Sequence, residues 1–233
     1  MFPSQRQRRP EVMDQPGLPP ARHAQALDGL ARINFWSGSA GILWPPLRDL
    51  AVRQGGRLRL LDLATGAGDV PIRLWRRAAR AGLTWEVHGC DVSPVAVAYA
   101  RERARAAAAG VQFFVHDALS GPPPDGFDAV VCSLFLHHLD EDQAVNFLGR
   151  MAATAGRLVL VSDLERSRAG LALARLGTRL LSASPVVHVD GPRSVEGAFT
   201  PDEVRSLAGR AGLRGATVVR RWPCRYLLAW ARP

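Results

Sequence analysis

The stretch that decides the fold reads Leu60-Leu61-Asp62-Leu63-Ala64-Thr65-Gly66-Ala67-Gly68-Asp69-Val70-Pro71. It begins as a run of aliphatic residues that ends in an acid, and it continues as a loop punctuated by glycine. The aliphatic run predicts a buried parallel strand, and glycine lets the loop backbone approach a ligand closely because it has no Cβ. Since ligands bind at the carboxyl ends of strands in open α/β sheets, the loop predicts a nucleotide-like site.

The loop excludes two common types of nucleotide site. A dinucleotide fold needs a third small residue where this sequence has Pro71, and Asp69 would put a negative charge where the pyrophosphate docks. A phosphate loop of the Gly-x-x-x-x-Gly-Lys type is excluded because the sequence contains no lysine.

The pattern Asp62-x-Ala64-x-Gly66-x-Gly68 resembles the first motif of class I S-adenosylmethionine-dependent methyltransferases, Asp/Glu-x-Gly-x-Gly-x-Gly. Ala64 departs from that motif. The resemblance covers roughly Leu58 to the C-terminus and implies S-adenosyl-L-methionine, which carries no phosphate, as the cofactor. It also implies a Rossmann-like, doubly wound α/β fold with a seven-stranded sheet, mostly parallel and closed by a terminal antiparallel hairpin.

Composition restricts the possible partners. The 233 residues, 47% of them hydrophobic, can bury one full-sized core. The net charge is +9, but the basic residues are all arginines spread along the chain, and no basic cluster interleaved with aromatics follows Arg6-Gln7-Arg8-Arg9. We therefore expect no specific nucleic-acid partner. The acceptor should be a small molecule, and the oligomeric state stays open.

The same sequence carries no signal of export or membrane insertion. The three cysteines have no paired spacing, which is typical of a reducing compartment. The N-terminus lacks the apolar segment of a signal peptide, and no uncharged apolar run is long enough to span a bilayer. These features predict a cytoplasmic protein without a transmembrane segment.

The chain divides into three parts by composition. Residues 1–20, rich in Arg and Pro, are expected to be a disordered tail, and residues 21–54 a helical cap of one or two helices around a break at Pro45-Pro46. Residues 55–233 are the expected methyltransferase domain, with a helical and loop insertion at about 164–199.

Aliphatic runs alternate with helical segments in the centre, which predicts right-handed crossovers and a parallel sheet. Strands are expected at 58–63, 85–90, 111–116, 127–133 and 157–162, and helices between them at 70–81, 94–109 and 141–153. An amphipathic helix at 166–183, a loop rich in Gly, Pro and Ser, a helix after Thr200 and a hairpin of 216–219 with 226–230 complete the expected order.

The first four expected strands end in residues that suit the cofactor. The family resemblance assigns Asp91, followed by Val92, to the ribose hydroxyls and Asp117, followed by Ala118, to the adenine amino group; Ser133 closes the fourth strand. Asp91 has an alternative role in capping the next helix with Ser93. Asp62 has two compatible roles, since it could bind the amino group of the cofactor or the loop amides. The predicted cofactor residues are Asp62, Ala64, Gly66, Gly68, Asp91, Val92, Asp117, Ala118 and Ser133.

Histidines supply the candidate bases. The Leu136-His137-His138-Leu139 form after the fourth strand resembles small-molecule methyltransferases, including the quinone-biosynthesis type. His137 and His138 are therefore candidate catalytic residues, although one could pack beneath the methionine end of the cofactor and the other could cap the helix near Asp140. His188, close to Asp190 in the insertion, is a further candidate base, with an ordinary hydrogen-bonded loop as the alternative.

The sequence also argues against two other kinds of site. Sequences typical of base-methylating enzymes, Asn/Asp-Pro-Pro-Tyr or a Pro-Cys pair after the fourth strand, are absent; the Pro-Cys pair of this chain is Pro223-Cys224. We expect no metal site, because adjacent His137 and His138 should face different directions and no further ligand joins them at metal-binding spacing.

The leading interpretation is methyl transfer, to oxygen or carbon, on a small aromatic or lipophilic metabolite. The leucine-rich helix with Trp36 and Trp44 suggests a hydrophobic acceptor, and the arginine face of that helix leaves a membrane-surface role open. The alternatives are an RNA or protein methyltransferase, and a non-catalytic cofactor-binding protein.

Overall fold

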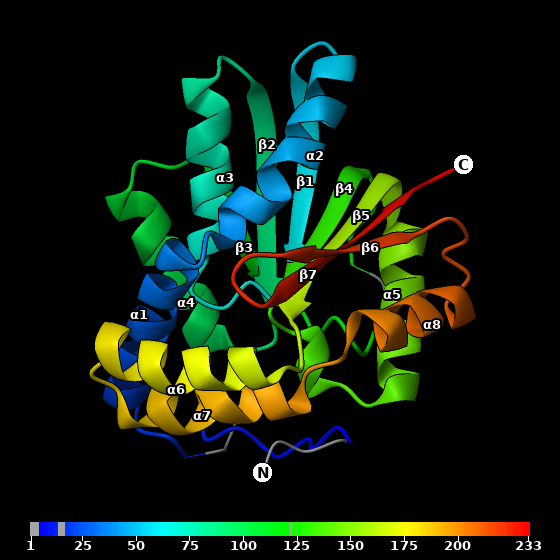
Figure 1. The fold of residues 1–233 in the computed structure, drawn as a ribbon. Helices are drawn as coiled ribbons and strands as arrows, with labels where there is room; N and C mark the ends of the chain where they lie inside the picture. The colour runs from blue at the N-terminus through cyan, green and yellow to red at the C-terminus, as the bar shows by residue number, and fades with distance from the viewer. Residues whose placement is uncertain (1–4, 14–16, 122) are drawn as a thin grey trace.

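A computed structural model describes residues 5–13, 17–121 and 123–233 (Figure 1). Within these residues, seven strands form one sheet in the order β3-β2-β1-β4-β5-β7-β6. The first five strands pair in parallel, and β7 pairs antiparallel with both β5 and β6. This confirms the predicted Rossmann-like, mostly parallel sheet with a terminal hairpin. The strands are β1 (Arg57–Leu63), β2 (Thr84–Asp91), β3 (Val111–Val115), β4 (Phe127–Ser133), β5 (Ala155–Leu164), β6 (Thr217–Arg221) and β7 (Arg225–Ala231).

Helices cover both faces of the sheet. Successive side chains of a strand point to opposite faces, so Leu60 packs into the core beneath α2, α3 and α4, whereas Leu61 packs into the core beneath α5 and α8. Both leucines are fully buried. The helices are α2 (Ser39–Arg53), α3 (Asp69–Arg80), α4 (Pro94–Ala106), α5 (Glu141–Thr154) and α8 (Pro201–Arg210).

Three further helices form a layer at the carboxyl ends of the parallel strands. They are α1 (Pro20–Trp36), α6 (Arg168–Leu181) and α7 (Pro185–Gly197), which pack against one another (Figure 1). The short 3-10 helix η1 (Leu136–His138), which follows β4, packs against α7. β1 lies between β2 and β4, so the connections that follow β1 and β4 run to opposite sides of the sheet centre. A crevice opens at such a point, here beneath the layer of α1, α6 and α7.

Two boundaries differ from the prediction. The expected Gly-, Pro- and Ser-rich loop is largely the helix α7, which contains Pro192 and buries Val187 against α1. The expected break at Pro45-Pro46 is also wrong, because α2 continues through both prolines with Leu43 and Leu47 fully buried. In both cases burial of apolar side chains outweighs the hydrogen bonds that proline cannot donate.

Residues 5–13, here called the N-terminal strap, do not behave as the expected disordered tail. Arg6 donates from Nε to the Gly197 carbonyl at 2.5 Å, and the amides of Val12 and Met13 donate to the carboxylate of Asp190 at 2.8 and 3.0 Å. The strap is held because its polar groups find partners on α7 and η1. Residues 1–4 and 14–16 of the predicted tail lie outside the described residues.

No helix in the described part of the chain is long and apolar enough to cross a membrane.

Candidate functional site

A cavity of about 1060 Å³ lies between the carboxyl ends of the strands and the layer of α1, α6 and α7. Its walls include the loop after β1, the ends of β2, β3 and β4, and the N-terminal strap. Ligand pockets typically span roughly 300 to 1,000 Å³, so this cavity has room for a cofactor and a second molecule.

The loop after β1 has the shape that its glycines predict. Ala64, Gly66 and Gly68 all have positive φ angles of 53°, 53° and 70°. Ala64 and Gly66 line the cavity, as predicted for cofactor-binding residues. Gly68 instead faces the core, where an added Cβ would lie 2.6 Å from the ring of Phe113. The glycine at 68 is therefore required by packing.

Asp91 connects the ends of β1 and β2. Its Oδ2 accepts a hydrogen bond from the amide of Gly66 at 2.8 Å, and its Oδ1 accepts one from the amide of Ser93 at 3.0 Å. The side chain of Ser93 caps α4 by accepting from the amide of Ala96. Asp91 and Val92 line the cavity, so the loop-holding contact and a ligand contact are compatible.

The ends of β3 and β4 complete this half of the cavity. Asp117 and Ala118 line it, and Oδ1 of Asp117 accepts the amide of Leu119 at 2.8 Å. Ser133 also lines it, and its buried hydroxyl finds no partner among the described residues. These residues leave acceptor oxygens available to donors of a ligand.

Two buried carboxyls lie at the loop. Asp62 is 2% exposed and Oδ2 accepts the hydroxyl of Thr65 at 2.6 Å. Burial raises the pKa of Asp62 to about 7, despite that hydrogen bond and with further repulsion from Asp69 and Asp91. Burial also raises the pKa of Asp69, against the pull of Arg73 and Arg103. Within the described chain, neither Oδ1 of Asp62 nor Oδ2 of Asp69 has a hydrogen-bond partner.

These orphaned oxygens test whether S-adenosyl-L-methionine fits. An ammonium group would supply these two unpaired oxygens with a hydrogen-bond donor that also carries positive charge. Asp69 lines the cavity, whereas Asp62 lies beneath the loop and does not. The amino acid end of the cofactor therefore fits against Asp69, with Asp62 behind it. Asp69 was not among the predicted cofactor residues, although it is the first residue of the helix after the glycine loop.

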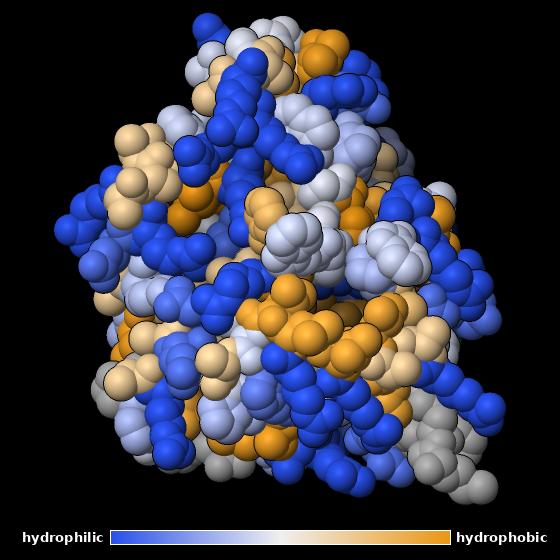
Figure 2. All heavy atoms as spheres, turned by 60° about the vertical axis from the view of Figure 1, so that its left-hand side comes forward, coloured by the Kyte–Doolittle hydropathy of each residue, from blue (hydrophilic) through white to orange (hydrophobic). Residues whose placement is uncertain are grey.

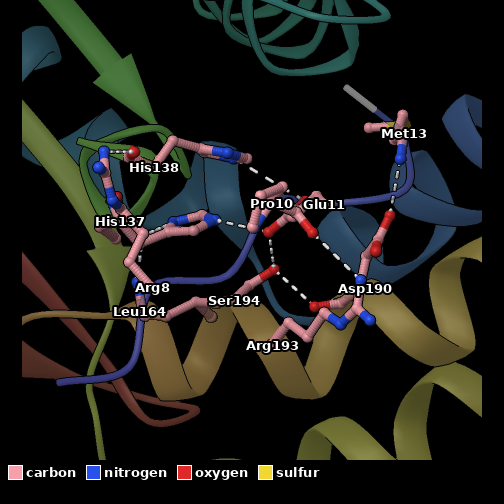
Figure 3. A network of polar contacts seen from close by, with 12 residues as sticks. Arg8, Pro10, Glu11, Met13, His137, His138, Leu164, Asp190, Arg193 and Ser194 are labelled. Carbon is pink, nitrogen blue, oxygen red and sulfur yellow. Dashed lines mark hydrogen bonds and ion pairs between the residues drawn. The ribbon is translucent and has the colours of Figure 1, made fainter. Parts of the chain in front are cut away.

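A second polar cluster lies at η1, which also lines the cavity (Figure 3). Nδ1 of His137 lies 2.7 Å from Oδ1 of Asp163 on β5, and Nε2 of His137 lies 3.5 Å from Oε1 of Glu11 on the strap. Nε2 of His138 lies 3.9 Å from Oε2 of Glu11. The two imidazole rings are 4.3 Å apart, so the expectation that they face different directions is wrong.

The charges of this cluster are coupled. Burial lowers the pKa of His137, but the carboxylates of Asp163 and Glu11 outweigh burial and raise it to about 10. Burial raises the pKa of Glu11, but its contacts with His137 and His138 bring it below the ordinary value. The imidazole of His137 therefore keeps its proton near neutral pH in this arrangement.

His188 lies apart from the other candidate bases. Its Nε2 is 2.8 Å from the carbonyl of Ser182, and it is not part of the cavity wall. Its expected partner Asp190 instead accepts the amides of Val12 and Met13 in the strap. The predicted His–Asp base in the insertion is therefore not assembled, because both side chains serve to hold main-chain groups.

Sequence reasoning missed two members of the η1 cluster. Glu11 is 7% exposed although it lies in a segment whose composition predicts disorder. Asp163 is fully buried in β5, and an acid within an otherwise apolar strand was an available signal. Only the fold brings these residues to His137.

The part of the cavity wall that α1 and α6 form is largely apolar. It contains Leu27, Leu30 and Ile33 of α1 and Leu173 of α6. Trp36 also lines it, whereas Trp44 packs against Trp85 in the core, so only the first of the two predicted tryptophans contributes. Figure 2 shows hydrophobic residues gathered in a patch bordered by hydrophilic ones on the side that carries α1 and α6.

Comparisons with known proteins agree with this geometry. Residues 60–155 match the family described as methyltransferase domain. The chain is 35% identical over 176 residues to a demethylmenaquinone methyltransferase of Thermus thermophilus, covering 70% of this chain and 77% of the relative. It is 32% identical to a 3-hydroxy-5-methyl-1-naphthoate 3-O-methyltransferase of Streptomyces sahachiroi, over 56% of this chain and 38% of that protein.

The fold is also similar to solved structures. A magnesium protoporphyrin IX methyltransferase from Synechocystis PCC 6803 with bound S-adenosylmethionine superposes with a TM-score of 0.57 at 16% identity. The match covers 95% of this chain and 88% of the other.

Proposed function

This chain belongs to the class I S-adenosylmethionine-dependent methyltransferases and resembles those of quinone biosynthesis. We propose that it methylates a small, aromatic or lipophilic acceptor at oxygen or carbon. The observation that carries the proposal is one continuous cavity with two unlike halves. Its polar half lies at the loop after β1, and its apolar half lies against α1 and α6.

In the polar half, we assign the cofactor contacts to the chain's own acceptors. Asp91 would accept the ribose hydroxyls, Asp117 the adenine amino group, and Asp69 with Asp62 the ammonium group. Each is a carboxylate, and carboxylates suit these donors. When bound, S-adenosyl-L-methionine supplies a reactive methyl group, so the main task of the protein is to hold the acceptor in line with it.

The apolar half supports a hydrophobic acceptor. Leu27, Leu30 and Leu173 provide contacts for a flat ring or a hydrocarbon chain, and burial of such a ligand is favourable in proportion to its apolar area. The acceptors named for the two curated relatives, a demethylated menaquinone and a hydroxylated naphthoate, are consistent with this chemistry.

We assign His137, His138 and Glu11 to the oxygen atom of the acceptor. All three line the cavity. The protonated imidazole of His137, with its pKa raised to about 10, would stabilise negative charge that develops on that oxygen. His138, which is more exposed, would take up the proton of a hydroxylated acceptor.

The test is methyl transfer from labelled S-adenosylmethionine to two probes, a short-chain demethylmenaquinone analogue and a hydroxynaphthoate. The proposal expects a methylated product from one of them, and fragmentation by mass spectrometry distinguishes a new O–CH₃ from a new C–CH₃ bond. Transfer to RNA or to protein, with neither probe methylated, would contradict it.

A further inference from the structure

Three side chains of types that bind metal ions meet at the acceptor side of the cavity. They are Glu11 of the strap and His137 and His138 of η1, and one ligand atom from each lies within 4.8 Å of the others. Figure 3 shows both imidazoles directed at Glu11. Glu11 is distant in sequence from the two histidines, and two of the three residues are buried.

The separations are close to those of a coordination shell. Zinc bonds to nitrogen and oxygen are about 2.0 to 2.2 Å long, which puts neighbouring ligands of a tetrahedron about 3.3 to 3.6 Å apart. The observed separations from Glu11 are 3.5 Å to Nε2 of His137 and 3.9 Å to Nε2 of His138. The two distances involve different oxygens of Glu11, Oε1 and Oε2, so the binding of one ion requires the three side chains to move closer together.

Hydrogen bonds from residues other than the three ligands already orient His137 and Glu11. Asp163 accepts from Nδ1 of His137 at 2.7 Å, which turns Nε2 toward Glu11. Ser194 on α7 donates its hydroxyl to Oε1 of Glu11. Metal-binding histidines characteristically have such a carboxylate on the second ring nitrogen.

The main chain around the cluster is also held in place. Arg6 donates to the carbonyl of His137 at 2.8 Å, and Arg8 donates to the carbonyl of His138 at 3.0 Å. Both guanidinium groups are thus engaged with main-chain oxygens of η1. The strap therefore holds η1 in place and also contributes Glu11 to the three ligands.

We propose that Glu11, His137 and His138 bind a divalent transition-metal ion, with Zn²⁺ as the ion that the ligands favour. Two imidazoles and one carboxylate are a nitrogen-rich set, which suits Zn²⁺ better than the oxygen-seeking Mg²⁺ or Ca²⁺. Three protein ligands leave one coordination position open, as in catalytic zinc sites. That position faces the cavity, since all three residues line it.

A bound ion would replace the Nε2 proton of His137 and occupy Nε2 of His138, so the roles assigned above to protonated His137 and to His138 as a base apply to the metal-free chain. With the ion bound, its open position would receive an oxygen atom of the acceptor, a role that rests on the proposed function. Metal binding itself does not rest on it, because the three ligands and their outer hydrogen bonds belong to the chain alone. The experiment therefore measures ion binding without cofactor or acceptor.

The full chain, freed of any histidine tag and treated with EDTA, is titrated with ZnCl₂ by calorimetry. We expect one ion bound per chain, and a Kd at least tenfold weaker for Glu11→Gln and for His138→Ala. Matched controls are Glu196→Gln, next to the strap, and His188→Ala, outside the cavity wall; both should bind Zn²⁺ like the unmodified chain. Visible absorption of bound Co²⁺ should report the same differences.

Thermal melting shows whether each variant folds. If Glu11→Gln does not fold, the Zn²⁺ affinity of His138→Ala is the test of the proposal. Absence of saturable Zn²⁺ binding, or equal affinity in the ligand variants and their controls, would overturn the proposal. Titration of every variant with S-adenosylhomocysteine is the separate test of the cofactor site. Retained cofactor binding without metal binding would remove the metal site and leave the proposed function in place.

Discussion

The carboxylate of Asp91 accepts a hydrogen bond from the amide of Gly66, with 2.8 Å between Oδ2 and nitrogen. This bond joins the loop after β1 to the end of β2, and both residues line the cavity. The acid that we assign to the ribose thus also holds the glycine loop in shape.

Replacing Asp91 with alanine should weaken the binding of S-adenosylhomocysteine at least tenfold, which corresponds to about 1.4 kcal/mol. The loss has two sources, the ribose acceptor and the loop amide. Calorimetry measures it. Asp128→Ala is the matched control, because Asp128 also accepts a main-chain amide, that of Arg59 at 2.8 Å, but does not line the cavity. Equal affinity in Asp91→Ala and the control would remove Asp91 from the ribose role.

Cofactor binding should release protons at pH 6. Without ligand, Asp62 has its pKa raised to about 7, so at pH 6 the carboxyl is mostly protonated. A bound ammonium group favours the carboxylate and lowers that pKa, and the proton leaves. Affinity should therefore increase as the pH rises toward 7 and change little above 8.

This proton release can be measured by calorimetry with S-adenosylhomocysteine in two buffers of different ionisation enthalpy. At pH 6 the apparent binding heats should differ, and in Asp62→Asn the difference should shrink. Identical heats in both buffers for the unmodified chain would mean that the buried carboxyls do not meet the ammonium group.

Two glycines of the loop should respond differently to alanine. Gly66 has a positive φ angle but no atom within 4 Å of an added Cβ, so Gly66→Ala should cost about 1 to 2 kcal/mol of unfolding free energy. Gly68→Ala carries the same strain and also a contact of 2.6 Å with Phe113, so its cost should be larger by about 1 to 3 kcal/mol. Urea denaturation measures both, and a similar cost for the two variants would argue against the packing role of Gly68.

His138→Ala should lower the rate of methyl transfer about a hundredfold or more while the Kd of S-adenosylhomocysteine stays unchanged. The reason is that His138, which we assign to the acceptor, belongs to η1 and not to the loop after β1 or to the ends of β2 and β3, which hold the residues assigned to the cofactor. His188→Ala serves as the control, because His188 bonds the carbonyl of Ser182 and does not line the cavity. Equal turnover in the two variants would be incompatible with the assigned role.

Much of the cofactor half follows from local sequence. The aliphatic run that ends at Leu63 predicts a buried strand, and the positive φ angles of Gly66 and Gly68 follow from residues that tolerate them. The acids Asp91 and Asp117 meet at one edge because parallel strands end there. Ala64 has the same backbone conformation, with φ of 53°, which is why its departure from the motif leaves the loop intact.

The errors have a common origin. Pro192 and the adjacent prolines of α2 predict interruptions, but the helices continue because Val187 and Leu47 are buried by neighbours that lie far away in the sequence. Local helix propensity does not include the free energy of burying side chains, which is gained only when the chain has folded.

The sequence by itself determined the succession of strands and helices, the glycine loop and the carboxylates that follow the strands, because each depends on residues close together in the chain or on the parallel arrangement of strands. Only the tertiary structure decided the cluster at η1. Glu11 meets His137 and His138 because Asp190 and Gly197 of α7 hold the strap against η1. A contact between residues so distant in sequence depends on the free energy of packing the whole chain, and no local pattern carries that information.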